Sequence, residues 1–219
     1  EIASCLVGSE MCIRDRYIPE NFEKFTTFAS FYLSLSIMNY IQTEIDGVWL
    51  IEPRVFSDER GYFMEAYKKE EFEANIGPVN FIQDNESKSS FGVLRGLHYQ
   101  KGEHSQAKLV RVLKGEVLDV AVDLRKSSPT FGKHVCVLLS EENKRQFFIP
   151  RGFAHGFAVL SEEAVFTYKV DNKYAPQAEA SILYNDEALG IDWPLAESQM
   201  LLSAKDREGT AFKDAVYFE

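Results

Sequence analysis

Residues 94–108 contain the densest group of side chains that could bind an anion or transfer a proton. The stretch reads Leu-Arg-Gly-Leu-His-Tyr-Gln and continues Lys-Gly-Glu-His-Ser-Gln-Ala-Lys. On an extended strand successive side chains point to opposite faces, so Arg95 and His98 are predicted to lie on opposite faces. His98 is then the candidate for acid/base chemistry, and it projects beside a glycine.

His155 is a second candidate, in the stretch Ile-Pro-Arg-Gly-Phe-Ala-His-Gly-Phe-Ala. Pro150 and Gly152 predict a tight turn before the strand that carries this imidazole. A single histidine among apolar neighbours is more often a structural residue than a catalyst. A second histidine in such a motif favours the catalytic interpretation.

Proton abstraction next to a carbonyl needs a base, a cation or donor at the developing enolate oxygen, and an acid that returns the proton. His98 suits the base, since an imidazole has a reference pKa of about 6.5. Lys108 suits the enolate donor. Tyr168 suits the acid, because a phenol with a reference pKa of about 10 is protonated at neutral pH. The structural alternatives are a solvated lysine for Lys108 and an aromatic strand residue for Tyr168.

Short strands separated by turn residues are predicted to position these groups. Val117–Leu124 alternates most clearly, with aliphatic side chains on one face and Asp119, Ala121 and Asp123 on the other. It is predicted to be a half-buried strand whose second face is wet or lines a polar cavity. Further strands are predicted at 48–56, 134–139, 146–149, 156–160 and 164–170, and a short helix at 68–76. Many short strands with little helix predict an all-β, double-sheet jelly roll.

Composition narrows the class of protein. A chain of 219 residues with 45% hydrophobic residues has the size of one barrel or sandwich domain. Its formal net charge of -10 disfavours a nucleic-acid or membrane partner, so an anionic ligand would need a local basic pocket. Cys136 is the single cysteine after residue 37, which predicts no disulfide framework and a cytoplasmic location.

Several motifs occur together in a specific order. They are the two stretches above, Asp58-Glu-Arg-Gly-Tyr-Phe63, Phe81-Ile-Gln-Asp-Asn85, and Asp119–Arg125 running into Ser128-Pro-Thr-Phe-Gly132. With these motifs the chain resembles the dTDP-4-dehydrorhamnose 3,5-epimerase family, which are cofactor-free sugar-nucleotide isomerases of the cupin-like jelly-roll type. The resemblance covers roughly Met38 to Phe218.

The resemblance implies a role for each matching residue. It implies that His98 is the base, oriented by Asp206, and that Tyr168 is the acid on the opposite face of the sugar. It implies that Arg95 and Lys108 bind the substrate and stabilise its charge. Other implied substrate contacts are Phe56, Arg60, Glu65, Gln83, Asn85, His155, Glu179 and Lys205, with Tyr174 stacked on thymine. Tyr184 and Lys173 depart from the usual pattern, which bears on nucleotide packing more than on the chemistry.

The implied reaction is epimerisation at C3 and C5 of dTDP-4-dehydro-6-deoxy-D-glucose, without a cofactor. The resemblance further implies a homodimer in which Phe56, Arg60 and Glu65 reach the partner's pocket. The alternatives are a single-centre epimerase or ketoisomerase on the same substrate, and a non-catalytic jelly roll that binds a sugar nucleotide.

A metal-dependent cupin is another alternative, because His98, His104, His155 and Glu103 could supply ligands. Metal cupins usually offer two histidines two residues apart on one strand face, whereas Gln100 follows His98 at that spacing. We therefore expect no catalytic metal.

Residues 1–37 do not share these patterns. The apolar run at 25–37 is too short to span a bilayer, and acidic residues mixed into the preceding basic stretch disfavour a signal peptide. Ser4–Arg16 resembles translated sequencing-adapter material. We expect residues 1–37 to be extraneous and poorly ordered, and residues 38–219 to form one jelly-roll epimerase domain.

Overall fold

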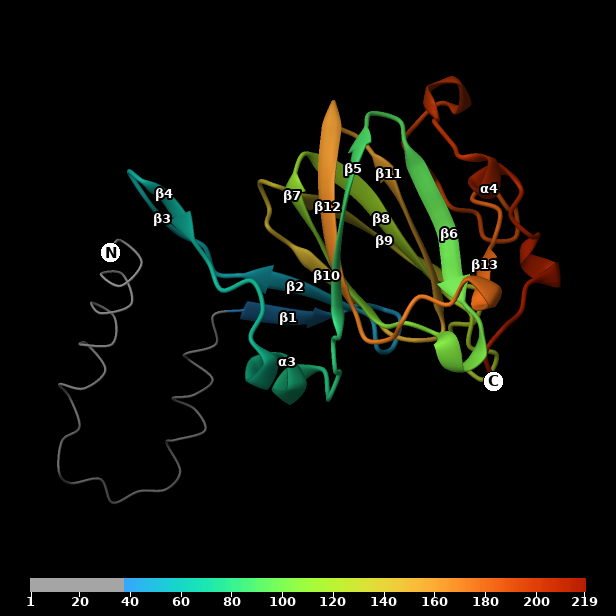
Figure 1. The fold of residues 1–219 in the computed structure, drawn as a ribbon, viewed down its shortest axis with the longest axis horizontal. Helices are drawn as coiled ribbons and strands as arrows, with labels where there is room; N and C mark the ends of the chain where they lie inside the picture. Colours follow the sequence, from blue (N-terminus) through green and yellow to red (C-terminus); the bar gives the residue numbers. More distant parts are fainter. Residues whose placement is uncertain (1–37) are drawn as a thin grey trace, which may run out of the picture. The chain divides into compact units, whose positions relative to one another are not determined.

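The computed structural model describes residues 38–219, in which two antiparallel sheets pack face to face (Figure 1). Sheet 1 has the order β1 (Met38–Gln42), β2 (Trp49–Pro53), β10 (Gln146–Ile149), β7 (Lys108–Lys114), β12 (Glu163–Val170) and β5 (Gln83–Ser90). Sheet 2 has the order β13 (Glu179–Ser181), β6 (Leu94–Gln100), β11 (Phe153–Val159), β8 (Glu116–Asp123) and β9 (His134–Ser140). The predicted all-β, double-sheet jelly roll is confirmed.

The remaining elements are short. The helices are α3 (Lys69–Asn75) and α4 (Ala204–Arg207), and the 3-10 turns are η1 (Gly102–His104), η2 (Pro176–Ala178), η3 (Glu197–Gln199) and η4 (Phe212–Asp214). The predicted helix at 68–76 agrees with α3, and the predicted strands at 134–139, 146–149, 156–160 and 164–170 agree with β9 to β12 within a few residues. The predicted strand at 48–56 is shorter, since β2 ends at Pro53.

The main core lies between the sheets. Sheet 1 contributes Val110, Phe147 and Phe166, and sheet 2 contributes Val117 and Phe157. Full burial of each such side chain contributes about 1.5–3 kcal/mol. The rings of Phe157 and Phe166 stack across the interface with centroids 4.3 Å apart, which joins the two sheets beside the pocket described below.

A second core covers the outer face of sheet 2. Val120 and Val122 of β8 pack there in one cluster with Leu189 and Trp193 from the C-terminal segment, which lies beside β6 and β13 (Figure 1). Asp119, on the inner face, is also fully buried. The prediction that this strand is half-buried is therefore wrong, because the Asp119 face packs between the two sheets and the C-terminal segment covers the aliphatic face.

Strand β6 contains a bulge where it pairs with β11. His98 is opposite His155 and Arg95 is opposite Phe157, so three steps along β6 match two along β11. Gly96 has φ +137°, and a Cβ on it would lie 2.5 Å from Cα of Gly156. The extra residue turns Arg95 and His98 to the same side, and the prediction of opposite faces is wrong because strict alternation fails at a bulge.

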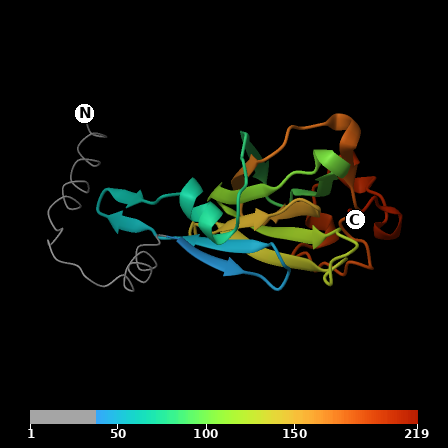
Figure 2. The same cartoon turned by 90° about the horizontal axis from the view of Figure 1, so that it is seen from below.

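A small hairpin extends beyond the sheets at the end opposite to α4 (Figures 1 and 2). It is formed by β3 (Phe56–Asp58) and β4 (Gly61–Phe63). Its aromatic side chains are exposed, with 57% of Tyr62 and 61% of Phe63 accessible.

The prediction that residues 1–37 are extraneous lies outside the described residues. Within residues 38–219, no helix has the length and apolar character needed to cross a bilayer.

Candidate active site

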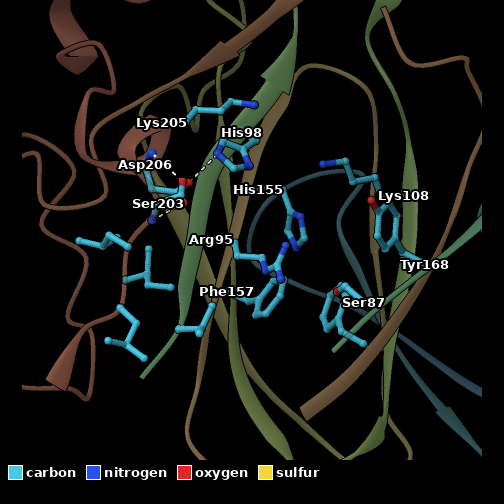
Figure 3. Close-up of a pocket in the computed structure, with 15 residues that line it drawn as sticks. Ser87, Arg95, His98, Lys108, His155, Phe157, Tyr168, Ser203, Lys205 and Asp206 are labelled. Carbon is cyan, nitrogen blue, oxygen red and sulfur yellow. Dashed lines mark hydrogen bonds and ion pairs between the residues drawn. The ribbon is translucent and has the colours of Figure 1, made fainter. Parts of the chain in front are cut away.

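A cavity of about 590 Å³ opens between the two sheets, a size suited to a small-molecule ligand (Figure 3). Strands β6 and β11 of sheet 2, β7 and β12 of sheet 1, and helix α4 supply most of its lining. The predicted site residues in its lining are Arg95, His98, Lys108, His155, Tyr168, Lys205 and Asp206. Seven residues from five elements thus meet at one site.

His98 and Asp206 form a pair at one side of this pocket. Nε2 of His98 lies 2.7 Å from Oδ1 of Asp206, which also accepts a hydrogen bond from N–H of Gly96. Ser203, the N-cap of α4, donates its hydroxyl to the other carboxylate oxygen. Burial alone would raise the pKa of Asp206, but the interactions with His98, Ser203 and Gly96 outweigh it and hold that pKa well below its ordinary value.

Lys108 and Tyr168 lie together on the other side of the pocket, on sheet 1 (Figure 3). Burial lowers the pKa of Lys108 to about 8, although the carboxylates of Asp119 and Glu179 oppose that shift. Burial raises the pKa of Tyr168, and the charge of Arg95 offsets part of the rise. Tyr168 therefore stays a proton donor at neutral pH, while Lys108 is charged but can lose its proton in mildly alkaline solution.

Arg95 supplies a second cation at the pocket. Its Nη2 and Nε donate to Oγ of Ser89 on β5, at 3.0 and 3.2 Å. This link ties sheet 2 to sheet 1 and orients the guanidinium. Arg95, Lys108 and Lys205 together make the pocket locally basic in a chain of net charge -10.

His155 lies between these two sides and is held by Asp119 of β8. Nε2 of His155 lies 2.9 Å and 3.0 Å from the two carboxylate oxygens of Asp119, and Asp119 is fully buried. Burial holds the pKa of His155 below its ordinary value, and the charge of Asp119 offsets only part of that effect.

Glu179 contacts two other predicted site residues, Tyr174 and Lys205. Its carboxylate accepts a hydrogen bond from the hydroxyl of Tyr174 at 2.8 Å and forms an ion pair with Lys205. The ring of Tyr174 is 57% exposed, so one of its faces can stack against a planar ligand. Glu179 and Tyr174 are thus linked to the pocket through Lys205, which lines it.

Seven predicted substrate contacts do not line the main pocket: Tyr174 and Glu179, described above, and five others. Gln83 and Asn85 lie on β5 and hydrogen-bond to each other at 2.7 Å, and Gln83 borders a second hollow of about 330 Å³. Phe56 and Arg60 belong to the β3–β4 hairpin, where Arg60 pairs with Asp58. Glu65 follows the hairpin and lies 4.0 Å from Nζ of Lys68.

The imidazoles considered as metal ligands are not gathered at one point. His104 lies in η1, outside the pocket that His98 and His155 line. Within residues 38–219, no group of three or more His, Cys, Asp or Glu side chains is arranged to hold a metal ion.

Three features in or beside the pocket were not predicted as functional from the sequence. Asp119 was identified only as a residue of an alternating strand face and of one motif, and Ser203 was given no role. Phe157 and Phe166 line the pocket and also belong to the core between the sheets. The one signal that could have indicated Asp119 is a carboxylate on the same strand face as Ala121, because an acid inside an apolar strand needs a partner.

The sequence profile of the dTDP-4-dehydrorhamnose 3,5-epimerase family matches residues 42–214. The chain belongs to this family. It is 58% identical over 182 residues to the dTDP-4-dehydrorhamnose 3,5-epimerase of Shigella flexneri, covering 83% of this chain and 99% of the relative.

Solved structures of the family share the fold. The dTDP-4-dehydrorhamnose 3,5-epimerase of Elizabethkingia anophelis has 56% identity and a TM-score of 0.80, over 83% of this chain and 100% of the other. The epimerase of Legionella pneumophila, solved in complex with dTDP-4-keto-L-rhamnose, has 56% identity and a TM-score of 0.74, over 77% and 89%. The epimerase family and its cupin-like jelly roll, predicted from the motifs, are thereby confirmed.

Proposed function

We propose that this protein epimerises C3 and C5 of dTDP-4-dehydro-6-deoxy-D-glucose and so forms dTDP-4-dehydro-L-rhamnose. One observation carries the proposal: His98 and Tyr168 come from opposite sheets and line one pocket. Inversion at carbon requires removal of a proton from one face of the sugar and delivery of a proton to the other. A base and an acid on opposite sides of the ligand meet that requirement.

The 4-keto group makes the C–H bonds at C3 and C5 acidic, because the carbanion is stabilised as an enolate. Nε2 of His98 faces Asp206, which leaves Nδ1 to remove the proton. The ammonium of Lys108 stabilises the negative charge that develops on the keto oxygen. Tyr168 then protonates carbon from the other face, and the same sequence of steps at the second carbon inverts that centre.

Electrostatics supports the assignment of the nucleotide. The diphosphate of a dTDP-sugar is anionic, and Arg95 and Lys205 offer cations at the pocket. We assign Gln83, Asn85, His155, Tyr174 and Glu179 as further substrate contacts, with thymine against the exposed ring of Tyr174. The free thiol of Cys136 is consistent with action in the cytoplasm.

We infer that the protein acts as a homodimer whose hairpins exchange between subunits. Phe56 and Arg60 lie on the projecting β3–β4 hairpin and do not line the pocket of their own chain, which supports a role in the partner's pocket. Mixing an Arg60→Ala variant with a His98→Asn variant tests this. Random reassociation of a twofold dimer would restore about a quarter of the sites. If the hairpin serves its own pocket, no activity returns.

The reaction itself is tested by incubating the protein with the 4-keto sugar nucleotide in deuterium oxide and examining the product by NMR. Inversion of both centres, with deuterium at C3 and C5, is expected. Inversion at one centre would assign a single-centre epimerase, and migration of the carbonyl a ketoisomerase. Binding without exchange or turnover would identify a non-catalytic binding protein.

A further inference from the structure

We propose that Asp119 is a positioning residue of the reaction: it fixes the orientation and tautomer of His155, and its negative charge favours the charged form of Lys108. The inference deepens the proposed function and rests on it for its kinetic test. Asp119 itself does not line the pocket, so it acts through these two side chains.

Asp119 is paired with His155, and packing of the core alone does not require this pair. Asp119 lies on β8 opposite Phe157 of β11, so His155, two residues away on β11, is its diagonal neighbour on the same face. Both carboxylate oxygens of Asp119 lie within 3.0 Å of Nε2 of His155. The surrounding side chains, such as Val117 and Ala121, are apolar core residues. Burying an ionised carboxylate among apolar side chains costs free energy unless the carboxylate is paired. The pair with His155 is therefore a functional feature of the site.

The pairing determines which nitrogen of His155 meets a ligand. A carboxylate accepts hydrogen bonds, so the proton of a neutral imidazole lies on Nε2. Burial and the nearby charges of Lys108 and His98 lower the pKa of His155, which favours the neutral ring. Nδ1 is then an acceptor, and the group that it recognises is a hydroxyl donor, such as a sugar hydroxyl.

Asp119 also affects the charge of Lys108. The carboxylate of Asp119 is the strongest opposing charge on that ammonium, and Glu179 of β13 is the second. The other groups around the pocket are Arg95 and His98 of β6, His155 of β11, Tyr168 of β12, and Lys205 and Asp206 of α4. Arg95 and Lys205 are cations, and their charges disfavour the protonated form of Lys108. Without Asp119, Lys108 would lose its proton at a lower pH.

Asp123 provides a matched control on the same strand. It is also fully buried, but its carboxylate is bound by Arg125, Ser128 and Thr130, away from the pocket. Asp119→Asn and Asp123→Asn therefore each remove one buried charge from β8. If Asp119 only contributes to stability, the two variants should have similar effects on kinetics.

The experiment compares the pH profiles of kcat/KM for the full chain and both variants. The alkaline limb, expected near pH 8 in the unmodified protein, should shift downward by about one pH unit in Asp119→Asn, since a nearby opposite charge moves a pKa by about 1–3 units. It should stay in place in Asp123→Asn. A folded Asp119→Asn variant with an unshifted limb would overturn the role toward Lys108.

A second measurement does not depend on activity or on the folding of Asp119→Asn. The chain has four histidines, so ¹⁵N NMR of histidine-labelled protein can assign His155 by the signals lost in His155→Gln. A neutral ring with its proton on Nε2 from pH 6 to 9 is expected. A proton on Nδ1, or a charged ring, would refute the tautomer argument. Absence of turnover in the unmodified protein would refute the proposed function while leaving this test intact.

Discussion

Oδ1 of Asp206 lies 2.7 Å from Nε2 of His98, and the same oxygen accepts the N–H of Gly96 on the strand that carries this histidine. One carboxylate oxygen thus holds both the imidazole and its backbone. Ser203, the N-cap of α4, holds the second oxygen. The helix therefore acts as a rigid support for the proposed base.

Replacing Asp206 by Asn should leave the fold intact and lower kcat. The amide of Asn can donate a hydrogen bond to Nε2 of His98 and so favours the tautomer with its proton on Nδ1. Nδ1 is the atom that must be unprotonated to act as the base. A comparable change beside a catalytic histidine costs up to about 10⁴-fold in kcat. Turnover should be compared with that of His98→Asn, which we expect to abolish deuterium exchange at C3 and C5. Exchange at the unmodified rate in Asp206→Asn would contradict the orienting role.

Tyr168→Phe should separate deprotonation from inversion. The change removes only the hydroxyl and leaves His98, Lys108 and Arg95 in place, so the enolate still forms. Without an acid on the far face, the enolate mostly recovers a proton from the His98 side. Net inversion should fall by about 10²–10⁴-fold, the usual contribution of a general acid, while exchange falls much less.

A single deuterium-oxide incubation measures both quantities, from label in recovered substrate and in inverted product. Equal losses of exchange and inversion would show that Tyr168 acts before or during deprotonation.

The buried amine of Lys108 should give the reaction an alkaline limit. Its pKa is lowered to about 8, so the ammonium is present below that pH and is lost as the pH rises through it. Tyr168 does not cause this limb, because its pKa is raised above its ordinary value. We expect kcat/KM to fall above pH 8 in the unmodified protein. Lys108→Arg should have a lower kcat/KM at pH 7, but that kcat/KM should stay constant up to pH 9.5, since a guanidinium keeps its charge. If kcat/KM of this variant still falls above pH 8, another group causes the alkaline limb.

Gly96→Ala should destabilise the fold at the bulge. Its φ is +137°, and the added Cβ would lie 2.5 Å from Cα of Gly156. Backbone strain and overpacking each cost about 1–3 kcal/mol, so the free energy of unfolding in urea should fall by about 2–6 kcal/mol. Gly77→Ala is the control, because its φ is +117° but nothing lies within 4 Å of the new Cβ. Equal losses of unfolding free energy in both variants would show that the positive φ, and not the close approach to Gly156, causes the whole effect.

Removal of metal ions should leave activity unchanged. The side chains in the pocket supply a base, an acid and cations, and His104 lies in η1, outside the pocket that His98 and His155 line. Turnover should survive prolonged dialysis against a chelator. Loss of activity, restored by one added ion, would favour the metal-dependent alternative.

Much of this protein could be predicted from local sequence. The alternation in 117–124 and the turn residues between strands indicated the all-β fold, because a period of two is a property of the strand itself. His98, Lys108 and Tyr168 could be selected by chemical type and motif. The structure brings all three into one pocket.

Only the tertiary structure determined on which face of a strand each side chain lies and which residues it contacts. Arg95 and His98 share a side because Gly156, distant in sequence, approaches Gly96 and accommodates a bulge that the sequence of β6 does not reveal. Asp119 meets His155 only through the register of β8 with β11. Side-chain type and strand period are local properties, whereas register, bulges and long-range pairing depend on which strands lie next to one another, and that is decided when the two sheets pack.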